Sequence, residues 1–132
     1  MNSEIFHNST SCIFCEIPAE RVLMQNDFAY LIKDGFPVTP GHTLIIPKRH
    51  AVDYFDLTQD ELLACDELIR LARSELISAD SEVAGFNVGV NAGAAAGQTI
   101  FHCHIHLIPR RYGDVESPRG GVRHVIPGKG HY

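Results

Sequence analysis

The chain has 132 residues, of which 45% are hydrophobic and 20% charged, so it is long enough for one domain with a buried core and too short for two. Its formal net charge of −5 makes the surface as a whole repel polyanions, which argues against nucleic acid as a partner. The sequence contains no stretch long and apolar enough to span a bilayer, and we expect no membrane association.

The ends of the chain are predicted to differ from its middle. Residues 1–11 are polar, without the hydrophobic segment of a secretory signal, and we expect a flexible N-terminus there. Residues 12–112 are expected to form the domain, and 113–132 a C-terminal arm of it. The spacing of the four cysteines is not that of a disulfide framework and indicates a reducing compartment, of which the cytoplasm is the simplest: Cys12, Cys15, Cys65 and Cys103.

Three strands are predicted in the first third of the domain. Short apolar, aromatic or β-branched runs occupy residues 21–24, 28–33 and 42–47, which is the composition of strands. Residues 25–27 form a plausible hairpin turn between the first two. Residues 36–41 contain two prolines and a glycine, so they must form a loop.

One long helix is predicted next. Thr58 followed by Glu61 three positions later is a capping box, and residues 78–82 are expected to end the helix. Apolar residues at spacings of three and four then form a stripe for the core: Leu62, Cys65, Ile69, Ala72 and Leu76. The charged opposite face is interpreted as solvent-exposed surface.

The last two strands are predicted at residues 85–90 and 99–108, with Pro109 closing the second. Between them lies a glycine- and alanine-rich loop, residues 91–97. Short antiparallel strands with a single long helix on one face describe an α+β domain.

Three histidines alternate along the last predicted strand: His102, His104 and His106. Because side chains in a strand have a period of two, all three are expected on one face, spread over roughly 13 Å. A row of three histidines is compositionally rare, which favours a functional site over a solvated strand face. The other face carries apolar residues that can meet the helix: Cys103, Ile105 and Leu107.

The chain resembles the histidine-triad superfamily in two blocks. The segment GQTIFHCHIHLIPR at residues 97–110 is similar to the signature of that family, and PGHTLIIPK at residues 40–48 is similar to its second block. Residues 12–111 follow the order of the family. The resemblance is closest to the small bacterial-type and fragile-histidine-triad-like nucleotide hydrolases. It implies a HIT-like fold, with one long helix packed on an antiparallel sheet, and a homodimer with one extended sheet.

The resemblance also implies catalytic roles for three histidines. His104 would be the nucleophile that attacks the α-phosphorus of a nucleotide and forms a nucleotidyl-histidine. An imidazole with a pKa of about 6.5 has a lone pair available for this at neutral pH. His106 would contact the phosphate oxygens, and His42 would help to orient the reacting centre.

The implied substrate is a small nucleotide, with contacts from four residues: Asn91, Gln98, Thr99 and His106. Gln98 and Thr99 would donate to oxygens that gain charge in the transition state, and Asn91 would meet the leaving side. A dinucleoside polyphosphate, an aminoacyl adenylate and an AMP phosphoramidate share the same reacting phosphate. We expect adenine dinucleoside polyphosphate hydrolysis, with adenosine phosphoramidate hydrolysis as the alternative.

A possible metal site begins with Cys12 and Cys15. By itself the C-x-x-C pair could equally be an incidental loop feature or a redox motif. It resembles the zinc-binding start of the bacterial-type branch, in which His50 and His102 would supply the other two ligands. Such a Cys₂His₂ set closes a tetrahedral structural zinc and leaves no open position for catalysis.

Two other functions remain open. In a metallohydrolase the three alternating histidines would bind a catalytic metal, although His102 and His106 converge poorly along one straight strand. In a nucleotide-binding sensor, the same histidines would hold a phosphate without turnover.

The arm, residues 113–132, is too rich in proline and glycine for a helix or a central strand. Such composition is usual for a disordered end. Its interleaved apolar and basic residues favour instead an ordered arm near the active site. Arg119 and Arg123 are then expected to face the phosphates beyond the scissile bond.

Overall fold

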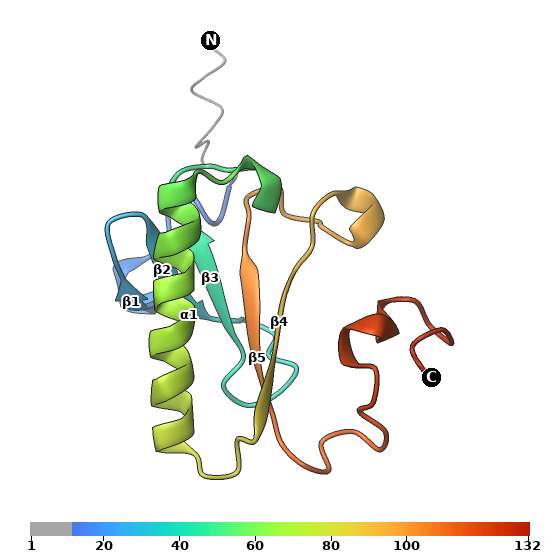
Figure 1. Ribbon diagram of the computed structural model, residues 1–132. Coiled ribbons are helices and arrows are strands. Elements are labelled where there is room, and N and C mark those ends of the chain that lie inside the picture. Colours follow the sequence, from blue (N-terminus) through green and yellow to red (C-terminus); the bar gives the residue numbers. More distant parts are fainter. Residues whose placement is uncertain (1–11) are drawn as a thin grey trace.

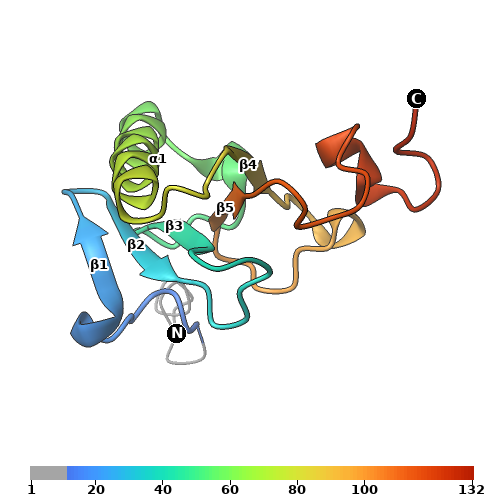
Figure 2. The same ribbon diagram turned by 90° about the horizontal axis from the view of Figure 1, so that it is seen from below.

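The computed structural model describes residues 12–132; the expected flexible segment, residues 1–11, lies outside the described residues. Five strands form one antiparallel sheet in the order β1-β2-β3-β5-β4. A long helix, α1, lies on one face of it (Figures 1 and 2). The predicted α+β class is confirmed. The elements are β1 (Val22–Gln25), β2 (Ala29–Lys33), β3 (Thr43–Pro47), α1 (Gln59–Ala79), β4 (Gly85–Val90) and β5 (Ile105–Arg110).

The hairpin between β1 and β2 forms at the predicted turn and is tied to the helix. The Oδ1 atom of Asn26 accepts hydrogen bonds from the amides of Phe28, at 3.1 Å, and Ala29, at 2.9 Å. Its Nδ2 atom donates to the carbonyl oxygen of Ala64 in α1, at 2.9 Å. One asparagine therefore closes the turn and fixes its distance from α1.

The helix begins with the predicted capping box. Thr58 accepts from the amide of Glu61 at 3.1 Å, and Glu61 accepts from the amide of Thr58 at 2.8 Å. The buried stripe is centred on a slightly different line than predicted, since Leu68 is buried whereas Leu62 is only half-buried. The physical reason is that Glu61 pairs with Arg49, so this acidic residue can turn toward the sheet and be buried.

The last strand differs from its predicted bounds at both ends. It begins at Ile105 rather than residue 99, and it continues through Pro109 to Arg110. Residues 99–104 form bends and irregular backbone, and the rings of His102 and His104 bond to backbone carbonyls there. Strand β3 pairs with β5 only as far as Leu107, so at Pro109 the strand has a neighbour on one side only, where proline is tolerated.

The sheet is covered on both faces around β3. Leu31 and Ile45 pack in the core under α1, whereas Ile32 and Leu44 pack in a second cluster with Phe14. The segment that follows Cys12 lies on the face opposite α1 (Figure 2). All five residues of β3 are buried for this reason, and the four that follow Thr43 form a continuous apolar run.

The C-terminal arm, residues 113–132, lies beyond the β4 edge of the sheet (Figures 1 and 2). It contains the short 3-10 helix η5 (Gly121–Val125), which contacts β4. The arm closes on its own last residue, because the guanidinium groups of Arg119 and Arg123 lie 4.6 and 5.0 Å from the ring centre of Tyr132. Such cation–π contacts hold the two halves of the arm together.

Two glycines of the arm occupy positions without room for a side chain. A Cβ atom at Gly120 would overlap the carbonyl oxygen of Gly130, and a Cβ atom at Gly130 would overlap the ring of His124. Gly120 also has a φ of +97°, a conformation that favours glycine.

Within residues 12–132 there is no helix with the length and apolar character needed to cross a membrane.

Candidate functional site

Three imidazoles meet at the junction of β3 and β5. His42 immediately precedes β3, and His106 in β5 pairs in register with Leu44. The Nε2 atom of His42 lies 2.9 Å from Nδ1 of His106, and the ring centres of His104 and His106 are 5.5 Å apart. The structure thus brings together the three histidines to which the sequence assigned catalysis. His102 does not join them, because its ring faces the Cys12–Cys15 segment.

The position of the hydrogen on His104 follows from its partner. Its Nδ1 atom lies 2.8 Å from the carbonyl oxygen of His102. A carbonyl oxygen only accepts, so Nδ1 carries the hydrogen and Nε2 keeps an unshared electron pair. The ring is half-buried beside Phe14, with 5.0 Å between ring centres. Nε2 is therefore the ring nitrogen of His104 that is left for a bond to substrate.

The hydrogens of His42 and His106 are fixed in the same way. The backbone amide of Val38 donates to Nδ1 of His42 at 3.1 Å, so the hydrogen of the neutral ring is on Nε2. That hydrogen points to Nδ1 of His106, which must accept. His106 therefore carries its own hydrogen on Nε2 and offers a donor to a ligand oxygen.

Asp34 belongs to the same network, and sequence reasoning missed it. Its Oδ2 atom lies 3.2 Å from Nε2 of His42 and 3.8 Å from Nδ1 of His106. The signal that could have found it is the register of the β2–β3 hairpin. Lys33 pairs with Thr43, so the next pair outward is Asp34 with His42, and the amide of Asp34 donates to the carbonyl of His42 at 3.1 Å.

The surroundings keep these rings neutral at neutral pH. Burial lowers the pKa of His42 below its ordinary value, and the Asp34 carboxylate opposes this in part. Burial also lowers the pKa of His106, with further lowering from His104 and His42 and opposition from Asp34. Neutral rings are what a chain of single hydrogen bonds requires.

Asp34, His42 and His106 also have the side chains of a metal site, with ligand atoms within 4.8 Å of one another. The hydrogen bonds argue against that use. Because Nδ1 of His42 accepts from Val38, its Nε2 bears the ring's hydrogen and has no lone pair for a metal. The rival metallohydrolase is disfavoured as well, since His102 is turned away from the ion that His104 and His106 would share.

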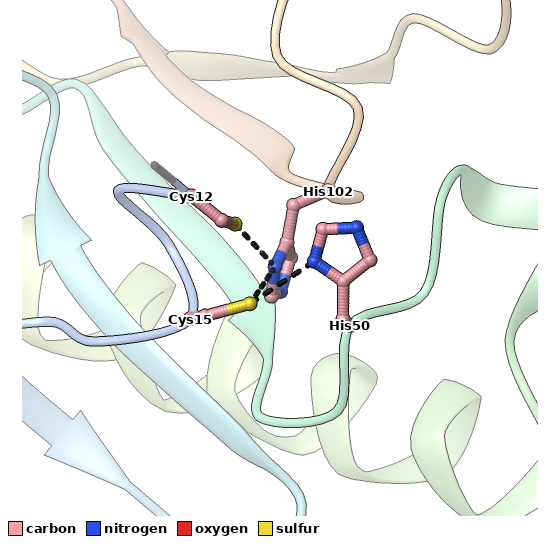
Figure 3. Close-up of side chains that lie close together, drawn as sticks. All are labelled: Cys12, Cys15, His50 and His102. Carbon is pink, nitrogen blue, oxygen red and sulfur yellow. Dashed lines mark hydrogen bonds between the residues drawn. The ribbon is translucent and has the colours of Figure 1, made fainter. Parts of the chain in front are cut away.

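A second cluster joins four residues from three separate segments (Figure 3). Its ligand atoms lie within 4.8 Å of one another: Cys12, Cys15, His50 and His102. Sγ of Cys15 is 3.0 Å from Nδ1 of His50 and 3.6 Å from Nδ1 of His102, and Sγ of Cys12 is 3.4 Å from the latter. A tetrahedral zinc with ordinary bond lengths separates its sulfur and nitrogen ligands by about 3.5 Å, so the donor set fits zinc.

The ring of His102 is oriented for such a role. Its Nε2 atom donates to the carbonyl oxygen of Pro47 at 2.8 Å, which leaves the lone pair of Nδ1 facing the two sulfurs. Bonds of this kind commonly fix the tautomer of a metal ligand. Burial lowers the pKa of His102 to about 4, so the ring stays neutral, as a metal ligand must be.

The remaining predicted contacts lie around the loop between β4 and β5. Asn91 and Thr99 are exposed, whereas Gln98 is buried. Gln98 accepts from the amide of Gly93 at 2.8 Å and donates to the carbonyls of Val52, at 2.7 Å, and Ile100, at 3.1 Å. Its amide thus holds the loop in shape, and a contact with phosphate requires it to exchange one of these bonds.

A cavity of about 480 Å³ opens beside the imidazoles. His42 and His106 line it on one side, and η5 of the arm lines it on the other. Arg119 and Arg123 are not among the described residues that line it; both guanidinium groups lie on Tyr132.

The fold and the site define a class of small α+β proteins. Its members combine an antiparallel sheet and one long helix with a hydrogen-bonded array of imidazoles where β3 meets β5. The family model described as the HIT domain matches residues 15–113. The chain belongs to the HIT family.

Relatives with stated activities support this assignment. The adenylylsulfatase HINT3 of Arabidopsis thaliana is 38% identical over 108 residues, which cover 78% of this chain and 54% of that protein. The diadenosine triphosphate hydrolase of Plasmodium falciparum superimposes with a TM-score of 0.70 at 28% identity, covering 77% of this chain and 69% of that one. Family membership places the chain among nucleotide hydrolases and transferases, as the sequence predicts.

A third similar protein bears on the cysteine cluster. A zinc-bound histidine-triad family protein from Mycobacterium smegmatis superimposes with a TM-score of 0.71 at 36% identity, covering 81% of this chain and 80% of that one.

Proposed function

We propose that the protein cleaves nucleotides at the α-phosphate through a nucleotidyl-histidine on His104. The observation that carries this proposal is the bond from Nδ1 of His104 to the carbonyl of His102, which leaves the lone pair on Nε2. In the first step Nε2 forms a bond to phosphorus, and the bond from phosphorus to the leaving group breaks. Water then attacks the phosphorus, which releases the nucleoside monophosphate and restores His104.

The neighbouring residues orient this centre. Nε2–H of His106 donates to a phosphate oxygen, and His42 holds His106 in the tautomer that can do so. Asp34 positions His42. Thr99 donates to oxygens that gain charge in the transition state, and Gln98 does so after its amide exchanges one of its bonds to the carbonyls of Val52 and Ile100. Asn91 meets the leaving side.

The candidate substrates share adenosine and differ in the leaving group. Hydrolysis of an adenine dinucleoside polyphosphate is supported by the similarity to a diadenosine triphosphate hydrolase. Hydrolysis of an adenosine phosphoramidate is the second candidate. The similarity to an adenylylsulfatase adds a third leaving group at the same phosphate.

The experiment that tests the proposal is a product assay. Purified protein is incubated separately with diadenosine triphosphate, adenosine 5′-phosphoramidate and adenylylsulfate, and AMP is quantified over time. Release of AMP that disappears in His104→Ala supports nucleotidyl transfer. Stoichiometric nucleotide binding without AMP release, for all three compounds, would instead identify a nucleotide-binding sensor.

We further propose that Cys12, Cys15, His50 and His102 hold a structural zinc. The donor set, the 3.0 to 3.6 Å separations of sulfur and nitrogen and the zinc-bound relative support it. Four protein ligands complete the coordination of zinc. The zinc would therefore stabilise the fold by joining the segment with Cys12 and Cys15 to the loops after β3 and before β5.

A homodimer and a cytoplasmic location complete the proposal. Strand β4 is at the edge of the sheet, and Val88 on it and Leu63 and Leu71 on α1 are exposed apolar side chains, which supports association of two copies. Light scattering coupled to size exclusion tests the dimer, and cell fractionation tests the location.

A further inference from the structure

The turn that holds Cys12 and Cys15 also carries an aromatic ring to the proposed nucleophile. The amide of Cys15 donates to the carbonyl oxygen of Cys12 at 3.2 Å, which closes a tight turn around the two residues between them. The two thiols point to the ring of His102 (Figure 3). Ile13 is exposed, whereas Phe14 is only 4% exposed, so Phe14 is the residue of this turn that enters the protein.

Phe14 contacts two of the three alternating histidines. Its ring centre lies 5.0 Å from that of His104, with an angle of 57° between the ring planes. It lies 6.1 Å from that of His102, and those two planes are nearly perpendicular at 84°. Both separations fall in the range of favourable aromatic pairs, between about 4.5 and 7 Å. The phenyl ring therefore packs against the proposed nucleophile and the proposed zinc ligand together.

The sheet holds Phe14 in place from the other side. Phe14 belongs to the buried cluster on the sheet face opposite α1, together with Ile32, Leu44 and Ile46. Ile32 is on β2 and the other two are on β3, and neither strand is at the edge of the sheet. Close-packed strand residues leave a buried ring little freedom to move. Because the strands supply this support, we expect it to persist without zinc.

The hydrogen bond of His104 needs such a neighbour, because it holds the ring at one atom only. The bond joins Nδ1 to the carbonyl oxygen of His102. Rotation of an imidazole about its bond to Cβ has broad, roughly two-fold minima, so a half-turn would carry Nδ1 away from that carbonyl. Packing against Phe14, and against His106 with 5.5 Å between ring centres, limits this rotation.

We propose that Phe14 is a positioning residue for the nucleophile: its ring keeps Nδ1 of His104 on the carbonyl of His102 and thereby aims Nε2 at phosphorus. The inference rests on the proposed function and adds a residue to it. Phe14 acts through His104 and not through the substrate, so its loss should lower the rate of attack rather than the affinity for nucleotide. Misplacement of a reacting group by about 1 Å can lower a rate by about a hundredfold.

The test compares two substitutions in the same buried cluster. Phe14→Leu removes the aromatic ring beside His104, whereas Ile32→Val, the matched control, removes a methyl group from the part of the cluster on β2. With the substrate that wild-type protein converts to AMP fastest, we expect Phe14→Leu to lower kcat by about ten- to a hundredfold and to leave KM nearly unchanged. Ile32→Val should keep both constants close to the wild-type values at temperatures where it is folded.

Nitrogen-15 NMR of the His104 ring gives a readout that a purely structural role would not move. In mildly alkaline buffer without substrate, the wild-type ring should show a single form with its hydrogen on Nδ1. Phe14→Leu should show a mixture of that form with the form protonated on Nε2, because the ring leaves the carbonyl of His102 part of the time. Ile32→Val should keep the single form. The signals are assigned by their loss in His104→Gln.

The outcomes separate this inference from the proposed function. An unchanged His104 signal in Phe14→Leu, or a raised KM with an unchanged kcat, would overturn the positioning role and leave nucleotidyl transfer intact. No AMP from any substrate in the wild-type protein would overturn the proposed function, while the NMR spectra would still decide whether Phe14 holds the ring. Phe14→Met gives a second reading if the leucine variant does not fold, because a flexible side chain fills the space without fixing its neighbour.

Discussion

His42 and His106 are joined by a single hydrogen, across 2.9 Å between Nε2 of the first and Nδ1 of the second. The direction of that hydrogen bond is set by a backbone amide, because Val38 donates to the other nitrogen of His42. A residue in the loop before β3 thus decides which nitrogen of a ring on β5 can donate to substrate.

The proposed nucleophile gives the first prediction. His104→Ala should lower turnover of any substrate by about a thousandfold or more, since no neighbouring group replaces an attacking Nε2. Nucleotide affinity should stay within a few-fold, because His106 keeps its donor. Single-turnover kinetics and titration calorimetry measure the two quantities. Near-normal turnover in the variant would assign the attack to another residue.

The second prediction concerns the titration of His42 and His106. Their lowered pKa values mean that both rings stay neutral as pH falls through about 6.5, the ordinary value. Below that pH the unfolded chain binds more protons than the folded chain, so these residues reduce stability as pH falls. NMR of histidine ring protons should show two midpoints below 6.5 that disappear in His42→Gln and His106→Gln.

Asp34→Asn sharpens the same test. The Asp34 carboxylate raises both pKa values, so its neutral replacement should move both midpoints to still lower pH. Midpoints that stay where they were, or rise, would show that the carboxylate does not act on these rings. Asp27→Asn, at the tip of the β1–β2 hairpin, is the matched charge control.

The third prediction is metal content. Protein purified without chelators should contain about one zinc per chain by mass spectrometry of metals. Cys12→Ser/Cys15→Ser should lose the zinc and much thermal stability, while the chemistry at His104 survives at temperatures where the variant is folded. Cys65→Ser is the control for zinc content, since this buried cysteine is on α1 and faces the core. Zinc-free wild-type protein would leave the four side chains without a metal role.

The fourth prediction concerns the start of α1. Thr58→Ala removes the cap and should cost about 1 kcal/mol of unfolding free energy. Glu61→Ala should cost more, about 2 kcal/mol, because Glu61 also accepts from Nε of Arg49 at 2.8 Å and from a second guanidinium nitrogen at 2.9 Å. The Glu61–Arg49 pair fixes Arg49, which directly precedes the proposed zinc ligand His50. Chemical denaturation measures both changes.

A charge control completes this test. Arg70 and Asp66 form an exposed pair on the same helix, and Asp66→Ala should change stability little. Equal effects of Asp66→Ala and Glu61→Ala would contradict the role given to burial. The Arg49 hydrogen bond lowers the pKa of Glu61 below its ordinary value of 4.5. The stability from this pair is therefore complete above about pH 4.5, and it is lost as pH falls through the lowered pKa of Glu61 in the folded protein.

Strand positions and the helix start were predictable because local chemistry decides them. Alternating or continuous apolar runs located β1 to β4 within one residue, and Thr58 with Glu61 located the helix start. The start of β5 was wrong by six residues. Alternation continues through residues 99–104, but the carbonyl of His102 is taken by the ring of His104. A sequence pattern reports which face a residue occupies and not whether a neighbouring strand is there.

Two parts of the candidate site required the structure. Asp34 has no spacing relationship to the histidines and reaches His42 only through the register of a hairpin. The arm was predicted from composition to use its arginines for phosphate, but Tyr132 folds back onto Arg119 and Arg123. Charge read along a sequence does not say which aromatic ring will cover it.

The packing at Gly120 and Gly130 has a consequence for any scan of substitutions through the arm. Every amino acid other than glycine brings a Cβ atom into occupied space at these two positions, while exposed neighbours such as Val115 and Ile126 have room for many side chains. A complete mutational map of the arm should therefore show its lowest tolerance at Gly120 and Gly130, and these two positions bracket the segment whose shape is fixed. Natural variation that replaces either glycine would mark a chain whose arm has taken another path.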